Sequence, residues 1–332
     1  MTEIVDKLEY GVTEIMRKGH KPSWWRQRFA SRVAGPALGQ IYNNDGVHVM
    51  EEDWDNLLIL DACRGDMFEQ GINTSQFDSY NRVHSIGTSS PDWMQNTFDN
   101  DTIYPDTVYV TGNPWISKIA PESFCHVRNL WLENYSITSE DLQDAIDLGD
   151  VEGVDTDKPV TIYADDLTRA AKEIYKEYPN KRLIVHYFQP HAPVVGNADG
   201  TRKEDIPAEL NPGSELHTGQ VTKEAVWEAY IENLRFAFHH AKDLAESIGG
   251  KSVYTSDHGE LFGERIWPFP IRAYQHPTGL RHPNLTEVPW AQKTLGDRRV
   301  IEAGEVEIHE ANLDKVDKRL EQLGYKVLHL SS

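Results

Sequence analysis

Acidic and imidazole side chains stand directly after two apolar runs that are far apart in the sequence. Asp61 follows NLLIL, and the pair Asp257 and His258 follows SVYTS. Two carboxylates and one imidazole make a mixed oxygen and nitrogen ligand set, which suits Mn²⁺, Zn²⁺ or Mg²⁺ better than Ca²⁺. The three residues therefore predict a site for one divalent metal ion. The alternative for Asp61, taken alone, is a helix cap or a loop residue.

The apolar runs before these residues predict the strands of a doubly wound α/β sheet. We expect strands at residues 56–60, 107–111, 160–163, 182–187 and 252–255, and helices at residues 90–97, 165–177, 223–247 and 312–323. Ligands of such sheets bind beyond the carboxyl ends of the strands, so residues that follow different strands meet in one crevice. Asp61, His191 and Asp257 all follow predicted strands, and we expect them to converge.

The composition excludes several kinds of partner. A net charge of −20 and a pI near 5.1 argue against binding to a phosphate backbone, so we expect no nucleic-acid partner. Such an excess of acid favours a halophilic source. The two cysteines, Cys63 and Cys125, do not make a disulfide framework, and no apolar stretch has the length of a transmembrane helix or the character of a secretory signal. We therefore expect a cytoplasmic protein.

The chain divides into a main domain and two appendages. We expect residues 51–300 to form the catalytic domain, residues 1–50 a helical segment that packs on it, and residues 301–332 a strand and helix appendage. One face of the first expected helix carries Ile4, Leu8, Val12 and Ile15.

Two neighbouring tryptophans stand in the N-terminal segment. Trp24, Trp25 and Arg26 could form a small docking surface, but packing on the main domain is the favoured interpretation. A role at a membrane surface is less favoured, because basic residues are few here.

Six motifs together resemble the sulfatase-like proteins of the alkaline phosphatase/sulfatase superfamily, in particular a haloarchaeal sulfatase-related group. Between Trp54 and Trp290 they occur in the family's order, as LILDACR, GTSSPDWM, VTGNPW, HYFQPHAP, TSDHGE and the stretch from HPTG to VPW. The resemblance implies a three-layer α/β sandwich, with a central, mostly parallel sheet and helices on both faces. It also matches Asp61, Asp257 and His258 to the family's metal ligands.

The resemblance further implies a hydroxyl nucleophile at the start of a helix beside the metal. There the ion lowers the pKa of the hydroxyl, and the helix N-terminus stabilises the incoming anion. GTSSPDWM offers Thr88, Ser89 and Ser90. An alignment on the glycine and the residue before proline selects Ser90 as the nucleophile and a fourth metal ligand, whereas an alignment on the proline alone selects Ser89. The alternative is that these hydroxyls only cap the helix.

Two histidines match substrate-facing positions of the family's single-metal branch. By that likeness, His191 and His276 protonate the leaving group or stabilise the charged oxygens of the substrate. For His186 and His282 we expect structural roles.

Arg64 and Thr88 are the candidate substrate-binding residues. A guanidinium suits the anionic oxygens of an ester because it donates in a fixed, bidentate geometry. The alternative for Arg64 is a salt bridge to Asp66 or to the acidic surface.

These features predict a metal-dependent hydrolase that acts on a phosphate or sulfate ester of a small molecule or glycan through an activated hydroxyl. The family's C/S-x-P-x-R pattern for formylglycine is not met, because neither Asp92 nor Trp93 supplies the arginine. An unmodified hydroxyl favours phosphorus over sulfur. Two alternatives stay open: a phospho-group transferase acting on a glycan or lipid precursor, and a non-catalytic binding module with the same fold.

Overall fold

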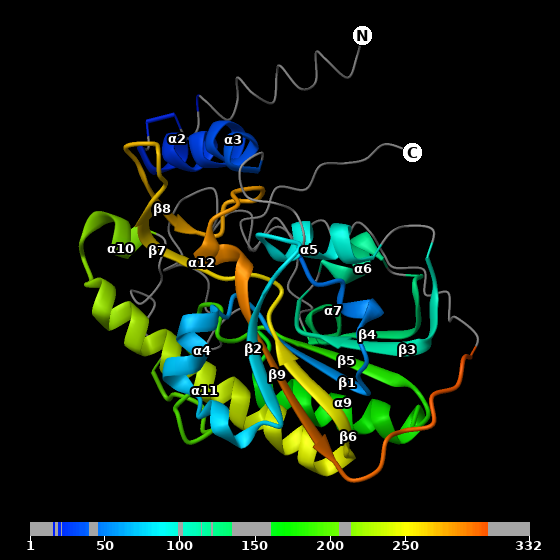
Figure 1. The fold of residues 1–332 in the computed structure, drawn as a ribbon. Helices are drawn as coiled ribbons and strands as arrows, with labels where there is room; N and C mark the ends of the chain where they lie inside the picture. The colour runs from blue at the N-terminus through cyan, green and yellow to red at the C-terminus, as the bar shows by residue number, and fades with distance from the viewer. Residues whose placement is uncertain are drawn as a thin grey trace.

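A seven-stranded sheet forms the middle layer of the molecule (Figure 1). The computed structural model describes residues 16, 19–20, 22–39, 46–98, 102–113, 115–120, 122–134, 161–205 and 214–304. Within them the strand order is β2-β9-β6-β1-β5-β3-β4. The strands are β1 (Asn56–Leu60), β2 (Ser79–His84), β3 (Tyr104–Thr111), β4 (Phe124–Asn129), β5 (Arg182–Tyr187), β6 (Gly250–Thr255) and β9 (Glu287–Leu295).

The centre of this sheet is parallel. β1 pairs in parallel with β5 and β6, and β3 pairs in parallel with β5 and β4. Only β9 runs the other way in the described sheet, where it pairs antiparallel with both β6 and β2. The carboxyl ends of β1, β3, β5 and β6 therefore meet at one edge, which is where a crevice forms in folds of this class.

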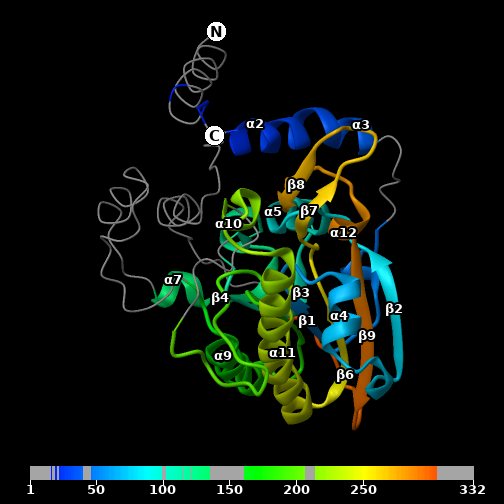
Figure 2. The same cartoon turned by 90° about the vertical axis from the view of Figure 1, so that its left-hand side faces the viewer.

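Helices cover both faces of the sheet. One face carries α4 (Gly65–Gly71), α9 (Ala164–Glu177) and α11 (Lys223–Ile248), and the other carries α5 (Ser90–Thr97) and α6 (Ile116–Ile119) (Figures 1 and 2). Successive side chains of β1 alternate between the two layers, because strand residues point to opposite faces. Leu58 and Leu60 pack in the core with α9 and α11, and Leu57 and Ile59 pack in the core with α5. This arrangement confirms the expected three-layer α/β fold.

A two-stranded sheet with three short helices lies at the same end of the central sheet as α5. It consists of the ribbon β7 (Leu261–Arg265) and β8 (Arg272–Gln275), with α2 (Pro22–Phe29), the π-helix η1 (Ala30–Ala34) and α3 (Gly35–Gly39) lying across it (Figure 2). Ala30, Ala34 and Leu38 share an apolar cluster with Leu261 of the ribbon and with Ile266, the residue directly after β7. The first turn of α3 lies very close to the loop after β8, since a Cβ added at Gly35 would lie 2.7 Å from the Gly279 carbonyl oxygen.

Short connecting elements complete the described chain. They are η2 (Val49–Glu51), η3 (Thr74–Gln76), α7 (Leu130–Asn134), α10 (Ser214–Thr218) and α12 (Pro283–Thr286). No described helix has the combination of length and low polarity that crossing a lipid bilayer requires.

The sequence-based expectations for the elements hold with one correction. The strands expected at residues 56–60, 107–111, 182–187 and 252–255 lie within β1, β3, β5 and β6, and the first three expected helices are α5, α9 and α11. The strand expected at residues 160–163 is wrong over its described part. Both edges of β5 are already paired with β1 and β3, and Gln189 Nε2 donates instead to the Ile162 carbonyl oxygen, at 2.9 Å. The predicted helices at residues 4–15 and 312–323 lie outside the described residues.

Arg298 joins two acidic residues at the opposite end of β1, and only one of them is buried. Asp55 accepts hydrogen bonds at 2.7 Å from the Lys251 backbone N–H and from Arg298 Nε. Burial opposes ionisation of Asp55, but the bonds from Arg298 and Lys251 lower its pKa overall. Asp53 pairs with Arg298 at 2.7 Å through a side chain that is 68% exposed.

We expect the two residues to differ sharply in their effect on stability. Asp55→Asn should lower the free energy of unfolding by about 3 kcal/mol, because it leaves a buried pair broken. Asp53→Asn should lower it by less than about 1 kcal/mol, because water already screens that pair. Urea unfolding of both variants measures the difference, and equal losses would contradict the assignment of Asp55 as the structural partner.

Candidate active site

Asp61, Asp257 and His258 lie together at the carboxyl ends of the neighbouring strands β1 and β6. All three side chains are buried, and their possible ligand atoms lie within 4.8 Å of one another. His258 Nε2 is 3.5 Å from Asp61 Oδ1 and 3.4 Å from Asp257 Oδ2. The parallel pairing of β1 with β6 brings these distant stretches of sequence together. We call Asp61, Asp257 and His258 the carboxylate cluster.

Each carboxylate of the cluster is held by one oxygen and leaves the other without a partner. Asp257 Oδ1 accepts hydrogen bonds from the backbone N–H groups of Ala62 (3.2 Å) and His258 (2.9 Å). Asp61 Oδ2 accepts one from Asn113 Nδ2, at 3.1 Å. Asp61 Oδ1 and Asp257 Oδ2 are buried without a hydrogen-bond partner among the described residues. Buried carboxylate oxygens in this state are costly unless a cation compensates them, so the donor set fits a divalent ion.

The electrostatics of the cluster agree with that fit. Burial and the neighbouring Asp257 carboxylate raise the pKa of Asp61 well above its usual range. Burial lowers the pKa of His258, which therefore stays neutral near pH 7. His258 Nδ1 lies 2.8 Å from the Gly259 carbonyl oxygen, to which it can donate its proton, so that the Nε2 lone pair points at the carboxylates. A neutral imidazole in this tautomer is the form that binds metals.

The tight turn in TSDHGE requires its glycine. A Cβ added at Gly259 would lie 2.1 Å from the Asn284 carbonyl oxygen. The backbone of this turn therefore packs against the segment before β9, which fixes His258 on one side and Glu260 on the other.

Ser90 is the hydroxyl of GTSSPDWM that contacts the carboxylate cluster. It is the first residue of α5, its side chain is buried, and its Oγ lies 3.3 Å from Asp61 Oδ2 and 3.4 Å from His258 Nε2. The amino end of a helix favours negative charge, so an anionic group bound next to Ser90 would be stabilised there.

The two preceding hydroxyls are used elsewhere. Ser89 Oγ lies 3.0 Å from Thr278 Oγ1, and Thr88 Oγ1 accepts a hydrogen bond from the Gly279 backbone N–H at 2.7 Å. Thr88 Oγ1 also donates to Asp92 Oδ2, at 3.0 Å. Thr88, a candidate substrate-binding residue, therefore fastens the start of α5 to the loop after β8, and the same loop begins with His276.

A second group of possible ligands adjoins the cluster. His191, Glu260 and His276 also offer ligand atoms within 4.8 Å of one another, and the His276 ring lies 4.6 Å from the His258 ring, centre to centre. His276 Nδ1 is 2.9 Å from Glu260 Oε2, whereas Glu260 Oε1 is buried with no partner in the described part of the chain. We call His191, Glu260 and His276 the histidine pair with its glutamate. The sequence-based expectation of a single ion did not include this group.

The two histidines of this group differ in their charge. Burial lowers the pKa of His191 to about 4, so this imidazole is neutral near pH 7. Burial acts in the same direction on His276, but the Glu260 carboxylate outweighs it and raises the pKa of His276. Glu260 therefore favours the protonated form of His276, which is suited to giving a proton to a leaving group.

Arg64 does not fit the role of a substrate clamp. Its guanidinium donates to both oxygens of Asp66, at 2.9 and 2.6 Å, and to Glu264 Oε1, also at 2.9 Å. It lies over the Trp227 ring, with 4.9 Å between the guanidinium carbon and the ring centre, and its pKa is raised by these acidic partners although burial opposes this. These contacts favour the alternative salt bridge for Arg64 over substrate binding, because they use the donors that would hold an ester.

Three residues of the site were not assigned to it from the sequence. Asn113 stands after β3 in VTGNPW and binds Asp61, and Glu260 follows His258 in TSDHGE. His186, for which a structural role was expected, lies with Nε2 3.5 Å from Asp257 Oδ2 and Nδ1 2.8 Å from the Tyr109 hydroxyl. All three stand beside or within motifs that the family resemblance marks, which is the signal that points to them. His282 caps α12 by accepting from the Asn284 backbone N–H, at 3.1 Å.

The backbone is strained beside both groups. Among the described residues, the non-glycine residues with positive φ are Ala62 (φ 61°), directly after Asp61, and Gln275 (φ 60°), directly before His276. Such conformations cost about 1–3 kcal/mol each and are retained where the surrounding structure enforces them. Their position indicates that the packing around the site fixes the direction of Asp61 and His276.

Comparisons with known proteins give a likeness of fold only. No protein-family model matches the sequence, and no curated protein matches it. The chain is similar to the integral membrane lipooligosaccharide phosphoethanolamine transferase A from Neisseria meningitidis, with 13% identity over 73% of this chain and 47% of that one and a TM-score of 0.44. This chain thus spans about half the length of that protein.

Two further structures complete the comparison. One is the C-terminal periplasmic domain of EcEptC from Escherichia coli in complex with Zn (12% identity, 73% of this chain, 72% of that chain, TM-score 0.42). The other is the phosphonate monoester hydrolase SpPMH from Silicibacter pomeroyi (12% identity, 81% of this chain, 73% of that chain, TM-score 0.42). At TM-scores below 0.5 these structures assign no activity, so the function is argued from the side chains.

Metal binding should stabilise the chain through the carboxylate cluster. We expect Mn²⁺ or Zn²⁺ at a hundred times its dissociation constant to raise the free energy of unfolding by about 2.7 kcal/mol. Asp61→Asn should abolish this response, yet leave the metal-free protein as stable as the parent or more so, because it removes one of two repelling carboxylates. Urea unfolding with and without the ion measures both effects.

Asp55→Asn is the matched control. Asp55 is also a buried aspartate, and it lies directly before the first residue of β1, whereas Asp61 lies directly after the last. It should lower the stability of the metal-free protein and keep the full response to the ion. An ion response that survives in Asp61→Asn would show that the cation binds elsewhere.

Proposed function

We propose that this chain is a metal-dependent enzyme that moves a phosphoryl-type group from an ester to Ser90 and then to water. The observation that supports the proposal is the position of the Ser90 hydroxyl at the start of α5, 3.3 Å from Asp61 Oδ2 and 3.4 Å from His258 Nε2. A hydroxyl at a helix N-terminus beside a divalent-ion site is suited to attack an anionic ester. The same contacts argue against a non-catalytic binding module, which has no need for that hydroxyl.

The carboxylate cluster and Ser90 would hold the ion, which would supply Lewis-acid chemistry and lower the pKa of the serine hydroxyl. The remaining work falls to residues of the chain. The amino end of α5 orients the ester and favours its charge. His191 lies beside His276, with 5.2 Å between the ring centres, and its neutral imidazole donates its one N–H from Nδ1 to the Ala192 carbonyl oxygen, at 2.7 Å. Its Nε2 is therefore left as an acceptor, which can take a hydrogen bond from the attacking water or from an acceptor hydroxyl.

The bond changes follow from these positions. The Ser90 hydroxyl first loses its proton to solvent. Its Oγ then forms a bond to phosphorus while the bond from phosphorus to the leaving oxygen breaks, and protonated His276 gives its proton to that oxygen. Water then attacks phosphorus, the bond to Ser90 Oγ breaks, and His276 takes up the proton of the water. Glu260 stabilises the charged form of His276 throughout the cycle, at 2.9 Å.

The chemistry of the nucleophile favours phosphorus over sulfur. The residues after Pro91 are Asp92 and Trp93, so the C/S-x-P-x-R pattern that precedes formylglycine is incomplete. An unmodified serine forms a covalent sulfate that lacks the hemiacetal route for its release. A phosphoserine, in contrast, can be hydrolysed by attack of water on phosphorus, which displaces the serine oxygen. A small molecule or glycan as the substrate, a cytoplasmic location and a halophilic source stay predictions.

The same geometry serves an alcohol acceptor as well as water. A transferase would pass the group from Ser90 to the hydroxyl of a glycan or lipid precursor, with His276 accepting the proton of that hydroxyl. Product analysis with glycerol added as acceptor separates the two activities. Free phosphate as the sole product identifies a hydrolase, and a glycerol ester formed in excess of its share of the solvent identifies a transferase.

Ser90→Ala should reduce kcat for a phosphate mono- or diester by at least about 10³-fold, because it removes the nucleophile. Ser89→Ala, which removes the adjacent hydroxyl, should reduce kcat by less than about tenfold. Assays of both variants with Mn²⁺ or Zn²⁺ measure the ratio. Retained turnover in Ser90→Ala would reject the covalent route.

His276→Gln should discriminate between leaving groups. With an alkyl ester, the loss of the proton donor should lower kcat by about 10²–10⁴-fold. With a 4-nitrophenyl ester the loss should be small, because this leaving group departs without a proton. Equal losses for both esters would instead indicate that His276 binds a second ion, which elemental analysis of the parent would show as two ions per chain.

A further inference from the structure

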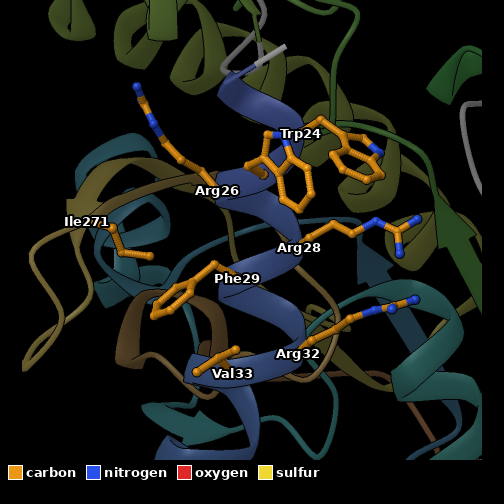
Figure 3. Close-up of a pocket in the computed structure, with 8 residues that line it drawn as sticks. Trp24, Arg26, Arg28, Phe29, Arg32, Val33 and Ile271 are labelled. Carbon is orange, nitrogen blue, oxygen red and sulfur yellow. The ribbon is translucent and has the colours of Figure 1, made fainter. Parts of the chain in front are cut away.

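A basic and aromatic surface projects from the N-terminal helix. The cavity along α2 and η1 has a volume of about 580 Å³, and Figure 3 shows Arg28 and Arg32 extending from the same side of this helix. Trp25 is 50% exposed, and Val33 is also exposed. We call this surface the α2 patch; it comprises Trp24, Trp25, Arg26, Arg28, Arg32 and Val33.

Charge is strongly segregated in this part of the sequence. Between Glu14 and Asp45 there is no acidic residue, although acidic residues outnumber basic ones by 53 to 33 in the whole chain. The basic residues of the stretch are Arg17, Lys18, Lys21, Arg26, Arg28 and Arg32. The expectation that basic residues are few applied to residues 1–50 together. In that whole segment, acidic residues on either side of the basic stretch offset its charge. The α2 patch is therefore a positive surface on an otherwise acidic protein.

Two arginines of the patch, Arg26 and Arg32, keep their charge available for a partner. Within the described part of the chain, Arg26 and Arg32 form no ion pair with an acidic side chain, and Arg26 Nη1 lies 2.6 Å from His217 Nε2. Arg28 stacks on Trp24, with 4.5 Å between the guanidinium carbon and the ring centre. Arginine over tryptophan is stable beside lipid headgroups, where one side of the contact is wet and the other apolar.

A second element presents apolar groups beside the patch. The turn between β7 and β8 reads WPFP, and its Trp267 is 76% exposed. Phe269 of the same turn packs edge-on against Phe29 of α2, with ring centres 5.4 Å apart. Tryptophan and arginine presented together by a helix and an adjoining turn are typical of proteins that bind at the interface of a bilayer.

We propose that the α2 patch and the β7–β8 turn bind the surface of an anionic phospholipid bilayer. The positive charge complements the headgroups, while Trp25 and Trp267 enter the boundary between headgroups and acyl chains. This binding does not depend on the activity of the site. Binding nevertheless bears on the site, because in the sequence the β7–β8 ribbon connects Glu260 to His276, so the membrane-bound turn and the site belong to one continuous segment.

Vesicle flotation of the intact chain tests the proposal. At low salt, the protein should float with vesicles of equal parts phosphatidylcholine and phosphatidylglycerol, and not with vesicles of phosphatidylcholine alone. The double variant Arg26→Gln with Arg32→Gln should bind roughly 25-fold more weakly, from about fivefold for each arginine. Raising the salt to about 1 M shortens the screening length to about 3 Å and should reduce binding of the parent to the level of this variant.

A control variant and a second patch variant separate the effect of the patch from a general loss of charge. Arg169→Gln with Lys242→Gln removes two exposed bases from α9 and α11, away from the patch, and should bind like the parent. Trp25→Ala with Trp267→Ala should weaken binding by a similar factor at low and high salt, since it removes apolar contact. Circular dichroism verifies that each variant is folded.

Two results would overturn the assignment. The first is no flotation of the parent with anionic vesicles at low salt, or flotation of the arginine variant equal to that of the control. The second is a dimer in sedimentation velocity that the arginine variant dissociates, without vesicle binding, which would assign the patch to an acidic surface of a second copy.

Discussion

Two buried carboxylates that share one imidazole set the central constraint on this molecule. Asp61 and Asp257 lie within 3.5 Å of His258 Nε2, and each leaves one oxygen without a hydrogen-bond partner among the described residues. Such a group is unfavourable in isolation, because burial and repulsion oppose its charge. A bound divalent cation offsets both the cost of burial and the repulsion between the carboxylates. The strained backbone at Ala62, the tight packing at Gly259 and the hydrogen bond from Asn113 to Asp61 hold these groups in place against their mutual repulsion.

The fold places this constraint where chemistry can use it. Parallel pairing of β6, β1 and β5 brings three strand ends to one edge of the sheet, and α5 begins there with Ser90. The loop after β8 is fastened to the start of α5 through Thr88 and Gly279, and it carries His276. The β7–β8 ribbon also supports α2, so the site and the basic surface share one structural support. Binding at that surface would orient the site without any change in its own residues.

Much of the central sheet could be predicted from the sequence, because buried parallel strands are short apolar runs. NLLIL and RLIVHY are recognisable without their partners. The outer strands are not: SYNRVH of β2 is mostly polar and exposed, and β9 contains Pro289, which lacks a donor for a strand neighbour. In the site, the motifs indicated Asp61, Asp257, His258 and Ser90. The salt bridge of Arg64 to Asp66 was also among the sequence-based alternatives, because the two residues are neighbours in the chain. The contacts of Glu260 with His276 and of Arg64 with Glu264 join residues 16 and 200 positions apart, and no local pattern encodes them.

The most direct measurement of the central claim is the anomalous diffraction of a crystal grown or soaked with Mn²⁺. The account predicts a manganese peak enclosed by Asp61, Asp257 and His258, with the Ser90 hydroxyl beside it. A map with no peak at that place, or a peak there with the Ser90 side chain turned away from it, would contradict the account.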